Sequence, residues 1–162
     1  MRGIKIVLLL LAFTIPSMTV EARSYIDNET PIEIQIACNK YGEQYNICPE
    51  LLEAICYQES RYSETAVDVT GECVGLMQVK ASCHKGRMNR LEIQDLTDID
   101  NNVHVGADYL SELFETYEDA GIVLGLYHGE TLAIQNGRTG NYSNYVKSIL
   151  ENSERLERLH GK

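Results

Sequence analysis

The chain has 162 residues, of which 44% are hydrophobic, and its formal net charge is −10. This length fits one domain that can bury a real core, and the composition is that of a globular protein without a long disordered segment. The acidic balance argues against a nucleic-acid-binding protein, whose affinity comes from Lys and Arg meeting phosphates, and against adsorption to an anionic membrane.

The amino terminus has the pattern of a secretion signal. Arg2 and Lys5 supply a positive start, residues 6–15 form a short apolar core, and Pro16 breaks it before small residues that suit a cleavage site. The apolar run is too short for a comfortable membrane span. The predicted organisation is a signal peptide over residues 1–22, a flexible lead-in over 23–29 and a folded domain over 30–162.

Five cysteines follow the predicted cleavage site, namely Cys38, Cys48, Cys56, Cys73 and Cys83. In a secreted chain, disulfides are the first expectation, and an odd number leaves at least one thiol unpaired in a monomer. The sequence does not choose among the possible pairings. Because no Cys-x-x-Cys occurs, we predict neither a zinc site nor a redox motif. Cys56 could also serve as a small buried hydrophobe in a helix.

The folded part begins with two predicted helices. Thr30 is expected to cap the first one, with Glu33 completing a capping box, and Gly42 marks its expected end. Pro49 begins a second helix that ends near Arg61. The apolar face predicted for the first helix consists of Ile34, Ala37, Cys38 and Tyr41.

The middle of the chain lacks a clear helical period. We expect a loop over residues 62–74, with a short strand pair around 67–74, and then a helical turn over 75–79. A polar, irregular stretch is expected to continue through residue 90. Residues 91–99 suit a short helix or a loop.

The carboxy-terminal half is predicted to be helical. The clearest helix spans about residues 100–118, since apolar residues recur there every three or four positions. A uniformly apolar helix over about 120–128 should be central, and glycines punctuate a loop over 136–140. The last helix, over 143–159, is expected to bury Tyr145, Val146, Ile149 and Leu150. Together these patterns predict a single, mainly α-helical domain.

One carboxylate stands where the second helix should be apolar. Leu51, Ile55 and Glu59 share a helix face, whereas Glu50 and Glu53 fall off that stripe. Loss of water favours the neutral form of a carboxyl, and so does the partial negative charge at a helix carboxy terminus. Both effects raise the pKa of Glu59 towards the range of a general acid. From this pattern alone, a solvated or Arg61-paired glutamate is the more ordinary interpretation.

Four groups of residues change that interpretation, because they occur in a familiar order over about residues 46–150. They are Glu59-Ser60 with Tyr62, Ala66, Gly71 and Gly75-Leu76-Met77-Gln78; Asn101-Asn102-Val103 with Gly106, Tyr109, Leu110 and Leu113; Leu126-Tyr127-His128-Gly129; and Tyr145-Val146. The combination resembles bacterial lytic transglycosylases with a soluble-transglycosylase, goose-lysozyme-like catalytic domain. The resemblance implies a lysozyme-like single domain with a small irregular or short β segment after the catalytic helix.

The resemblance also implies an activity, cleavage of the β-1,4 bond between N-acetylmuramic acid and N-acetylglucosamine in peptidoglycan. It places the catalytic acid on Glu59, which then takes a proton from the muramoyl 6-hydroxyl, giving a 1,6-anhydro product. The N-acetyl group of the substrate is thought to stabilise the cation, so no second carboxylate is obligatory, unlike in most glycosidases. The enzyme would be a lyase without metal or cofactor.

Several further residues receive roles from the same resemblance. Gln78 would line the sugar cleft and the Met77 backbone would be available to the substrate. Tyr127 would orient Glu59, although a lone tyrosine is more often a core residue with a satisfied hydroxyl. Ser60 contacts the substrate or caps its helix. The residues expected to shape the domain without touching the reacting bond are Asn102, Gly106 and Tyr109.

The chain also departs from the family pattern. His128 stands where Asn is common, and an imidazole there could bind sugar or be structural. The loop over 71–75 carries an apparent extra residue, and a bridge between Cys73 and Cys83 is a plausible staple for it. A second carboxylate could position a water and turn the reaction to hydrolysis. The candidates for that role are Glu64, Asp68, Glu72 and Glu130.

Two other functions remain open at this point, a hydrolytic muramidase and a non-catalytic cell-wall-binding or assembly protein of the same fold. The expected partner is the peptidoglycan glycan strand, with a secretion or conjugation apparatus as a second partner by analogy and with no nucleic acid. We expect a monomer that is secreted across the bacterial inner membrane and acts in the periplasm or cell wall.

Overall fold

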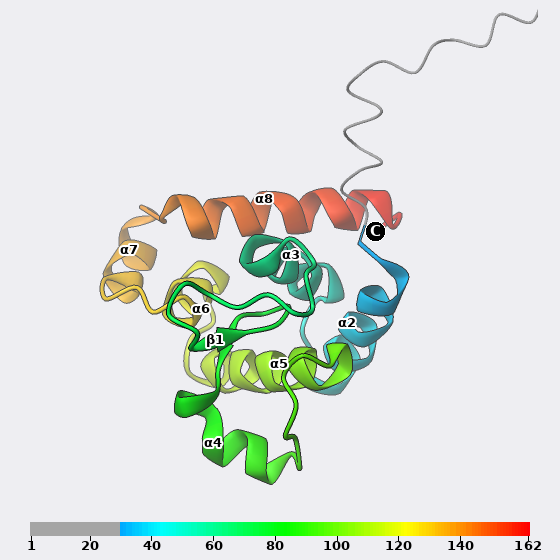
Figure 1. Ribbon diagram of the computed structural model, residues 1–162. Helices are drawn as coiled ribbons and strands as arrows, with labels where there is room; N and C mark the ends of the chain where they lie inside the picture. Colours follow the sequence, from blue (N-terminus) through cyan, green and yellow to red (C-terminus); the bar gives the residue numbers. More distant parts are fainter. Residues whose placement is uncertain (1–29) are drawn as a thin grey trace, which may run out of the picture.

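Helix α3 (Pro49–Ser60) packs against α8 (Asn144–Leu159) on one side and against α2 (Ile32–Tyr45) on the other (Figure 1). The computed structural model describes residues 30–162, so the predicted signal peptide (1–22) and lead-in (23–29) lie outside the described residues. The other elements are β1 (Cys73–Val74), β2 (Val79–Lys80), α4 (Ala81–Arg90), α5 (Ile99–Thr116), α6 (Ala120–Tyr127) and α7 (Ala133–Thr139).

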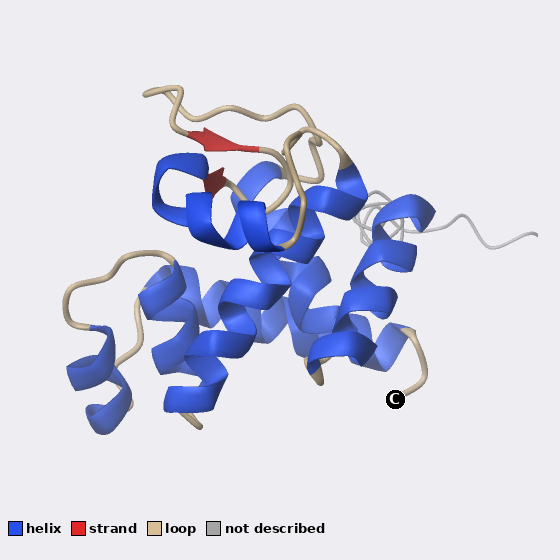
Figure 2. Ribbon diagram, turned by 90° about the horizontal axis from the view of Figure 1, so that it is seen from below, coloured by secondary structure: helices blue, strands red, loops and turns tan. Residues whose placement is uncertain are grey.

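The predicted fold class is confirmed, since the described chain is mainly helical with one small antiparallel pair of strands after α3. Helix α8 crosses one side of the molecule and α4 projects from the opposite side (Figure 1). Figure 2 shows the two short strands together on one side of the helices. Within residues 30–162, no helix has the length and apolar character needed to cross a membrane.

The start and the end of α2 differ from the prediction. The helix begins after Pro31, and Thr30 caps nothing, because its hydroxyl donates to Glu53 of α3. Gly42 does not end the helix, which continues to Tyr45. A Cβ at Gly42 would lie 2.7 Å from the carbonyl oxygen of Ile47, so the glycine permits a close approach of the following chain rather than a stop.

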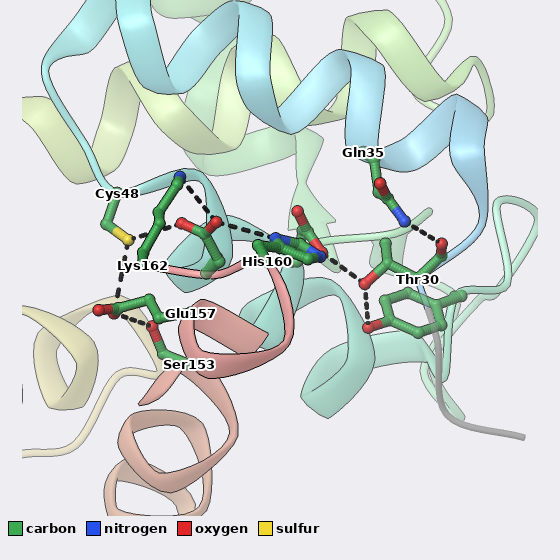
Figure 3. Close-up of polar contacts among 10 residues, drawn as sticks. Thr30, Gln35, Cys48, Ser153, Glu157, His160 and Lys162 are labelled. Carbon is green, nitrogen blue, oxygen red and sulfur yellow. Dashed lines mark hydrogen bonds and ion pairs between the residues drawn. The ribbon is translucent and has the colours of Figure 1, made fainter. Parts of the chain in front are cut away.

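Helix α3 is buried around most of its circumference in its first two turns. Leu51 and Ile55 are in the core, as predicted, but Glu50 and Glu53 are each only 1% exposed although they lie off the apolar stripe. Their burial is possible because partners reach them from outside the helix, Thr30 for Glu53 and the carboxy-terminal residues for Glu50 (Figure 3).

Residues 73–80 form a hairpin, so residues 75–79 are its turn and the start of β2 instead of the expected helical turn. β1 pairs with β2 in the register Cys73↔Lys80 and Val74↔Val79, and an isolated bridge joins Val67 to Val74. The prediction of a short strand pair near 67–74 is therefore right in place but incomplete in pairing. Gly75 adopts φ +79°, and a Cβ there would lie 2.4 Å from the carbonyl oxygen of Leu96.

Helix α4 replaces the polar, irregular stretch that the sequence predicted up to residue 90. None of its residues is fully buried, and it is kinked at His84, where φ is −113°. The helix is tied to α5 by ion pairs of Arg87 and Arg90 with Asp108, at 3.0 and 2.8 Å. Only Ala81 and Met88 of this helix pack against the core, so its sequence has no apolar period and the ion pairs with Asp108 provide much of its attachment.

The carboxy-terminal helices mostly follow the prediction. α5, α6 and α8 match the expected spans within about two residues. Helix α7 was not predicted, because Gly137 was interpreted as part of a loop. Gly137 lies inside the helix, and a Cβ added there would lie 2.1 Å from Ile122 Cγ1. Ser143 caps α8 by accepting a hydrogen bond from the Val146 amide at 3.2 Å.

All five cysteines are free thiols in the structure. Cys38 and Cys56 are buried in the core, which agrees with the alternative interpretation of Cys56 as a small hydrophobe. The bridge expected between Cys73 and Cys83 is not formed.

Candidate active site

A cleft of about 730 Å³ opens beside the carboxy-terminal end of α3. Its walls come from α3, the β1–β2 hairpin, α4, α5 and the end of α6. Four of the predicted site residues line it, namely Glu59, Gln78, Tyr127 and His128. Residues that are far apart in the sequence are therefore gathered around one cavity.

Glu59 is the buried acid of this cleft. Its side chain is 14% exposed, and Oε1 accepts a hydrogen bond from the Tyr145 hydroxyl at 2.5 Å. Burial raises the pKa of Glu59, and the Tyr145 hydrogen bond and the charge of His128 only partly offset that rise. The carboxyl is thus held near a cavity in an environment that favours the protonated form, as a general acid requires.

Tyr145 orients Glu59, a role that the resemblance had given to Tyr127. Tyr145 lies in the first turn of α8, and its ring stacks on that of His128 with centroids 3.8 Å apart and planes at 16°. Burial, together with the charge of Glu59, raises the pKa of Tyr145, so the hydroxyl stays a hydrogen-bond donor. The sequence placed Tyr145 in a motif and on the buried face of the last helix. It did not predict the bond to Glu59, because nothing in the sequence reports a contact across 86 positions.

Tyr127 instead connects α6 to the hairpin. Its hydroxyl donates to the carbonyl oxygen of Met77 at 2.8 Å, and its ring lies in the cleft wall. Burial raises the pKa of Tyr127 well above its ordinary value. The prediction that its hydroxyl orients Glu59 is therefore corrected, and Tyr127 fixes the hairpin turn that carries Gln78.

Met77 lies behind the cleft wall and not in it. Its side chain is fully buried and packs closely against Gly106. A Cβ added at Gly106 would lie 2.4 Å from Met77 Sδ. The Met77 amide donates to Asn102 Oδ1 at 2.8 Å, and the carbonyl accepts from Tyr127. The amide is therefore committed to the fold, in contrast to the expectation that it serves the substrate, whereas Asn102 shapes the domain as expected.

Gln78 and Ser60 differ in how they face the cavity. Gln78 lines the cleft from a left-handed backbone position, φ +47°, and its side-chain amide donates to the carbonyl oxygens of Gly75 and Ala66 at 2.9 and 3.2 Å. The Ser60 hydroxyl donates to the carbonyl oxygen of Cys56 at 3.0 Å within α3. This bond favours the structural alternative for Ser60.

The far wall of the cleft contains residues that the sequence analysis did not place in a site. The rings of His84, Tyr109 and Tyr127 follow one another at centroid distances of 4.7 and 5.6 Å, and Arg87 lies over Tyr109 at 5.1 Å. Aromatic faces of this kind suit the apolar faces of sugar rings. His84 and Arg87 were missed because α4 itself was missed, whereas Tyr109 was expected only to shape the domain.

Among the candidate second carboxylates, Asp68 lines the cleft. It accepts hydrogen bonds from the amides of Cys73 and Glu72 and from Thr70, and these bonds lower its pKa to about 2. Glu72 pairs with Lys80 at 2.5 Å, and Glu130 accepts a bond from Ser143. Within residues 30–162, no group of three His, Cys, Asp or Glu side chains is arranged to hold a metal ion.

Comparison with known proteins gives the family. Residues 36–148 match the family described as Transglycosylase SLT domain. The chain is 37% identical over 116 residues to the X polypeptide of Escherichia coli, covering 67% of this chain and 68% of that protein. It is 30% identical over 99 residues to Protein IpgF of Shigella flexneri, covering 57% of this chain and 64% of that protein.

A solved structure has the same fold. It is the X-ray structure of an inactive mutant of the lytic transglycosylase Slt from Pseudomonas aeruginosa, with a TM-score of 0.69 and 17% sequence identity. The match covers 87% of this chain and 27% of that one. With the family match over most of its folded part, the chain belongs to the transglycosylase SLT domain family and has a lysozyme-like fold.

Proposed function

We propose that the protein cleaves the β-1,4 bond between N-acetylmuramic acid and N-acetylglucosamine in peptidoglycan, with Glu59 as the general acid and then the base. The observation that carries the proposal is the Glu59 side chain, 14% exposed beside a cleft and hydrogen-bonded by Tyr145. Burial raises its pKa, so the proton needed by the leaving oxygen is retained to higher pH. In the related Slt of Pseudomonas aeruginosa, the inactive mutant has glutamine in place of one glutamate.

The proposed reaction proceeds in two steps without water. Glu59 donates its proton to the glycosidic oxygen, the bond to the anomeric carbon breaks, and the N-acetyl group of the muramoyl residue stabilises the cation. The Glu59 carboxylate then takes the proton of the muramoyl 6-hydroxyl, whose oxygen bonds to the anomeric carbon. The products are a free N-acetylglucosamine end and a 1,6-anhydro-muramoyl end, and Glu59 is protonated again.

We propose two kinds of role for the predicted substrate-binding residues, direct contact with the sugar and support of the residues that make that contact. Gln78 and His128 contact the sugar directly, because both line the cleft. Tyr127 presents its ring as part of the wall, and Met77 acts by holding the hairpin turn through its bonds to Asn102 and Tyr127. Ser60 acts by stabilising the last turn of α3, from which Glu59 projects.

A glutamine variant tests the acid. Glu59→Gln keeps the size and the hydrogen-bond acceptor for Tyr145 but removes the proton, so clearing of purified cell walls should be lost. Glu64→Gln is the matched control and should clear walls at the native rate, because Glu64, one of the candidate second carboxylates, is exposed in the loop after α3 and does not line the cleft. Full activity of Glu59→Gln would reject Glu59 as the catalyst. Sedimentation of both the native protein and the variant with walls that neither of them clears would favour the non-catalytic binding protein.

A hydrolytic muramidase is the second candidate, and Asp68 is the observation that favours it. Its pKa of about 2 keeps it charged, opposite in tendency to Glu59 in the same cleft, and such a divergent pair is the arrangement of many glycosidases. The mass of the released muropeptides separates the two reactions, because anhydro products lack one water. A wholly hydrated product set would reject the transglycosylase and direct attention to Asp68→Asn.

The setting of the enzyme is part of the proposal. We propose a monomer that is exported across the bacterial inner membrane by its first 22 residues and acts locally on glycan strands in the periplasm or cell wall. A secretion or conjugation apparatus that must pass the wall is the proposed associate, by analogy with other small lytic domains. Cell fractionation and co-purification with such an apparatus test both statements.

A further inference from the structure

Helix α4 forms one wall of the cleft although it has no buried face of its own. It projects from the molecule (Figure 1), and Ala81 and Met88 are its only residues that pack against the core. The helix nevertheless contributes Cys83, His84 and Arg87 to the cleft. An element with so little apolar burial belongs to the less stable part of a fold, so other contacts must fix its position.

Asp108 of α5 provides those contacts. Its Oδ2 atom lies 3.0 Å from Arg87 Nε and 2.8 Å from Arg90 Nη2, and its Oδ1 atom accepts a second bond from Arg90 at 3.1 Å. Arg87 and Arg90 are three residues apart, on the same face of α4. From the other side, the Tyr45 hydroxyl of α2 donates to Oδ1 at 3.1 Å. Asp108, only 7% exposed, therefore joins α4 to α5 and to α2.

The charge of Asp108 is needed at this junction. Burial opposes the charge, but the hydrogen bonds from Arg90 and Tyr45 and the positive charges of the arginines outweigh burial and lower the pKa of Asp108. The Arg87 side chain is only 8% exposed, and its other carboxylate partner, Glu112, is 66% exposed. Removing the charge of Asp108 would therefore leave a buried guanidinium with one solvated partner, which is costly.

The junction continues into the aromatic part of the cleft. The Arg87 guanidinium lies 5.1 Å from the centroid of the Tyr109 ring, and the His84 ring follows at 4.7 Å from Tyr109. These three side chains line the cleft, whereas Asp108 and Arg90 do not. A change at Asp108 can therefore reach a bound sugar only by moving the α4 wall.

We propose that Asp108 is a positioning residue that holds α4 against α5, so that His84, Arg87 and Tyr109 form a preassembled wall for a sugar ring away from the bond that is cleaved. This inference rests on the proposed cleavage of glycan strands. A wall that is displaced part of the time lowers the apparent affinity by the fraction of molecules in which it is in place. Because a ring remote from the reacting bond is bound equally before and during the reaction, loosening the wall raises KM and leaves kcat unchanged.

The first test compares the native protein with Asp108→Asn, using soluble, uncross-linked peptidoglycan strands as substrate. KM should rise by about tenfold, because a buried charge pair is broken, while kcat stays within about twofold of the native value. Asp100→Asn is the matched control. Asp100 is also on α5 and also binds a tyrosine, Tyr41 at 2.6 Å, and a cation, Lys40 at 2.8 Å, but it lies outside the cleft. An unchanged KM in Asp108→Asn, or an equal rise in both variants, would overturn the proposal.

The arginine side of the junction gives a second test that does not disturb a buried residue. Arg90 is 58% exposed, so Arg90→Gln should fold normally even if Asp108→Asn does not. KM should rise by about two- to fivefold, the worth of an exposed ion pair, and Arg90→Lys should restore most of the affinity because it keeps the charge. Lys40→Gln is the control and should keep the native KM. A native KM in Arg90→Gln, or the same KM in Arg90→Gln and Arg90→Lys, would reject the charged attachment of α4.

Amide hydrogen exchange measures the position of α4 without using activity. Peptides that cover residues 81–90 should exchange faster in Asp108→Asn and Arg90→Gln than in the native protein, while peptides of α3 exchange at the native rate. Native exchange of residues 81–90 in these variants would reject the role of Asp108, even where Glu59→Gln is inactive and the proposed function stands. Conversely, wall clearing by Glu59→Gln would reject the proposed function and leave the exchange result unaffected.

Discussion

The two ends of α3 place a buried carboxylate in opposite environments. Glu50, at the start of the helix, is 1% exposed and is surrounded by partners, with His160 Nδ1 at 2.9 Å, Lys162 Nζ at 2.7 Å and the Cys48 thiol at 3.1 Å (Figure 3). Glu59, at the end of the same helix, faces a cleft and has one hydroxyl donor, Tyr145.

The environments drive the ionisation of the two groups apart. Burial opposes the charge of Glu50, but the bonds from Lys162, His160 and Cys48 outweigh it and lower its pKa to about 2. Burial dominates at Glu59 and raises its pKa. A carboxylate whose partners are complete stabilises the fold, whereas one whose partners are incomplete is available for proton transfer. This difference assigns stability to the start of α3 and chemistry to its end.

The largest expected effect is on catalysis by Glu59→Gln. We expect wall cleavage to fall by about 10²- to 10⁴-fold, the usual contribution of a general acid. The folded state should be retained, because the amide oxygen can still accept the bond from Tyr145. The measurement is the initial rate of muropeptide release, with thermal unfolding followed on the same sample. A Glu59→Gln protein that loses its fold together with its activity would contradict the assignment of chemistry, and not stability, to the end of α3.

The converse change is Glu50→Gln. It replaces charge-assisted hydrogen bonds by neutral ones, which should cost about 2 kcal/mol of the free energy of unfolding at pH 7. The specific activity of the folded molecules should stay native, because Glu50 does not line the cleft. Urea unfolding measures the cost, and Glu154→Gln is the matched control, an exposed glutamate of α8 expected to change stability by less than about 0.5 kcal/mol. A Glu50→Gln protein as stable as that control would contradict the assignment.

The sequence allowed the role of one of these two carboxylates to be predicted, but not that of the other. Glu59 could be predicted, because it interrupts an apolar stripe with period 3.6 and begins a recognisable motif. The burial of Glu50 could not, because its partners His160 and Lys162 come from 110 and more positions away, where an isolated basic residue looks solvated. The same limit hid Tyr145 as the partner of Glu59.

Local pattern also decided which helices could be predicted. Helices α5 and α8 present a continuous apolar face, so their spans could be predicted within about two residues. Helix α4 is attached by Arg87 and Arg90 to Asp108, a contact without any apolar period, and was predicted to be irregular. One wall of the cleft therefore became visible only in the structure.

A smaller effect is expected for Tyr145→Phe, which keeps the ring under His128 and removes the hydroxyl from Glu59. Loss of this bond should reduce kcat by about tenfold, equivalent to roughly 1.4 kcal/mol. Because the bond lowers the pKa of Glu59, the alkaline limb of the rate profile should also move to higher pH. Tyr142→Phe is the matched control, since the Tyr142 hydroxyl donates to Asp119 at 2.7 Å outside the cleft. Equal rate losses in both variants would mean that Tyr145 acts only through stability.

The smallest effect separates the two ends of α3 by the sign of a pH dependence. The folded pKa of Glu59 is raised above its unfolded value, so the native protein loses stability as pH rises from the ordinary glutamate range, near 4.3, through the raised value. Glu59→Gln has no such loss and should have a slightly higher Tm than the native protein at pH 7 but the same Tm at pH 3.

The folded pKa of Glu50 is about 2, so its contribution is present above pH 4.3 and disappears as pH falls towards 2. Glu50→Gln should therefore have a lower Tm than the native protein at pH 7, with the deficit closing as the pH approaches 2. Calorimetry of both variants over this range measures these differences in Tm. If both variants differed from the native protein with the same sign at pH 7, the environments of Glu50 and Glu59 would not have opposite effects on their ionisation.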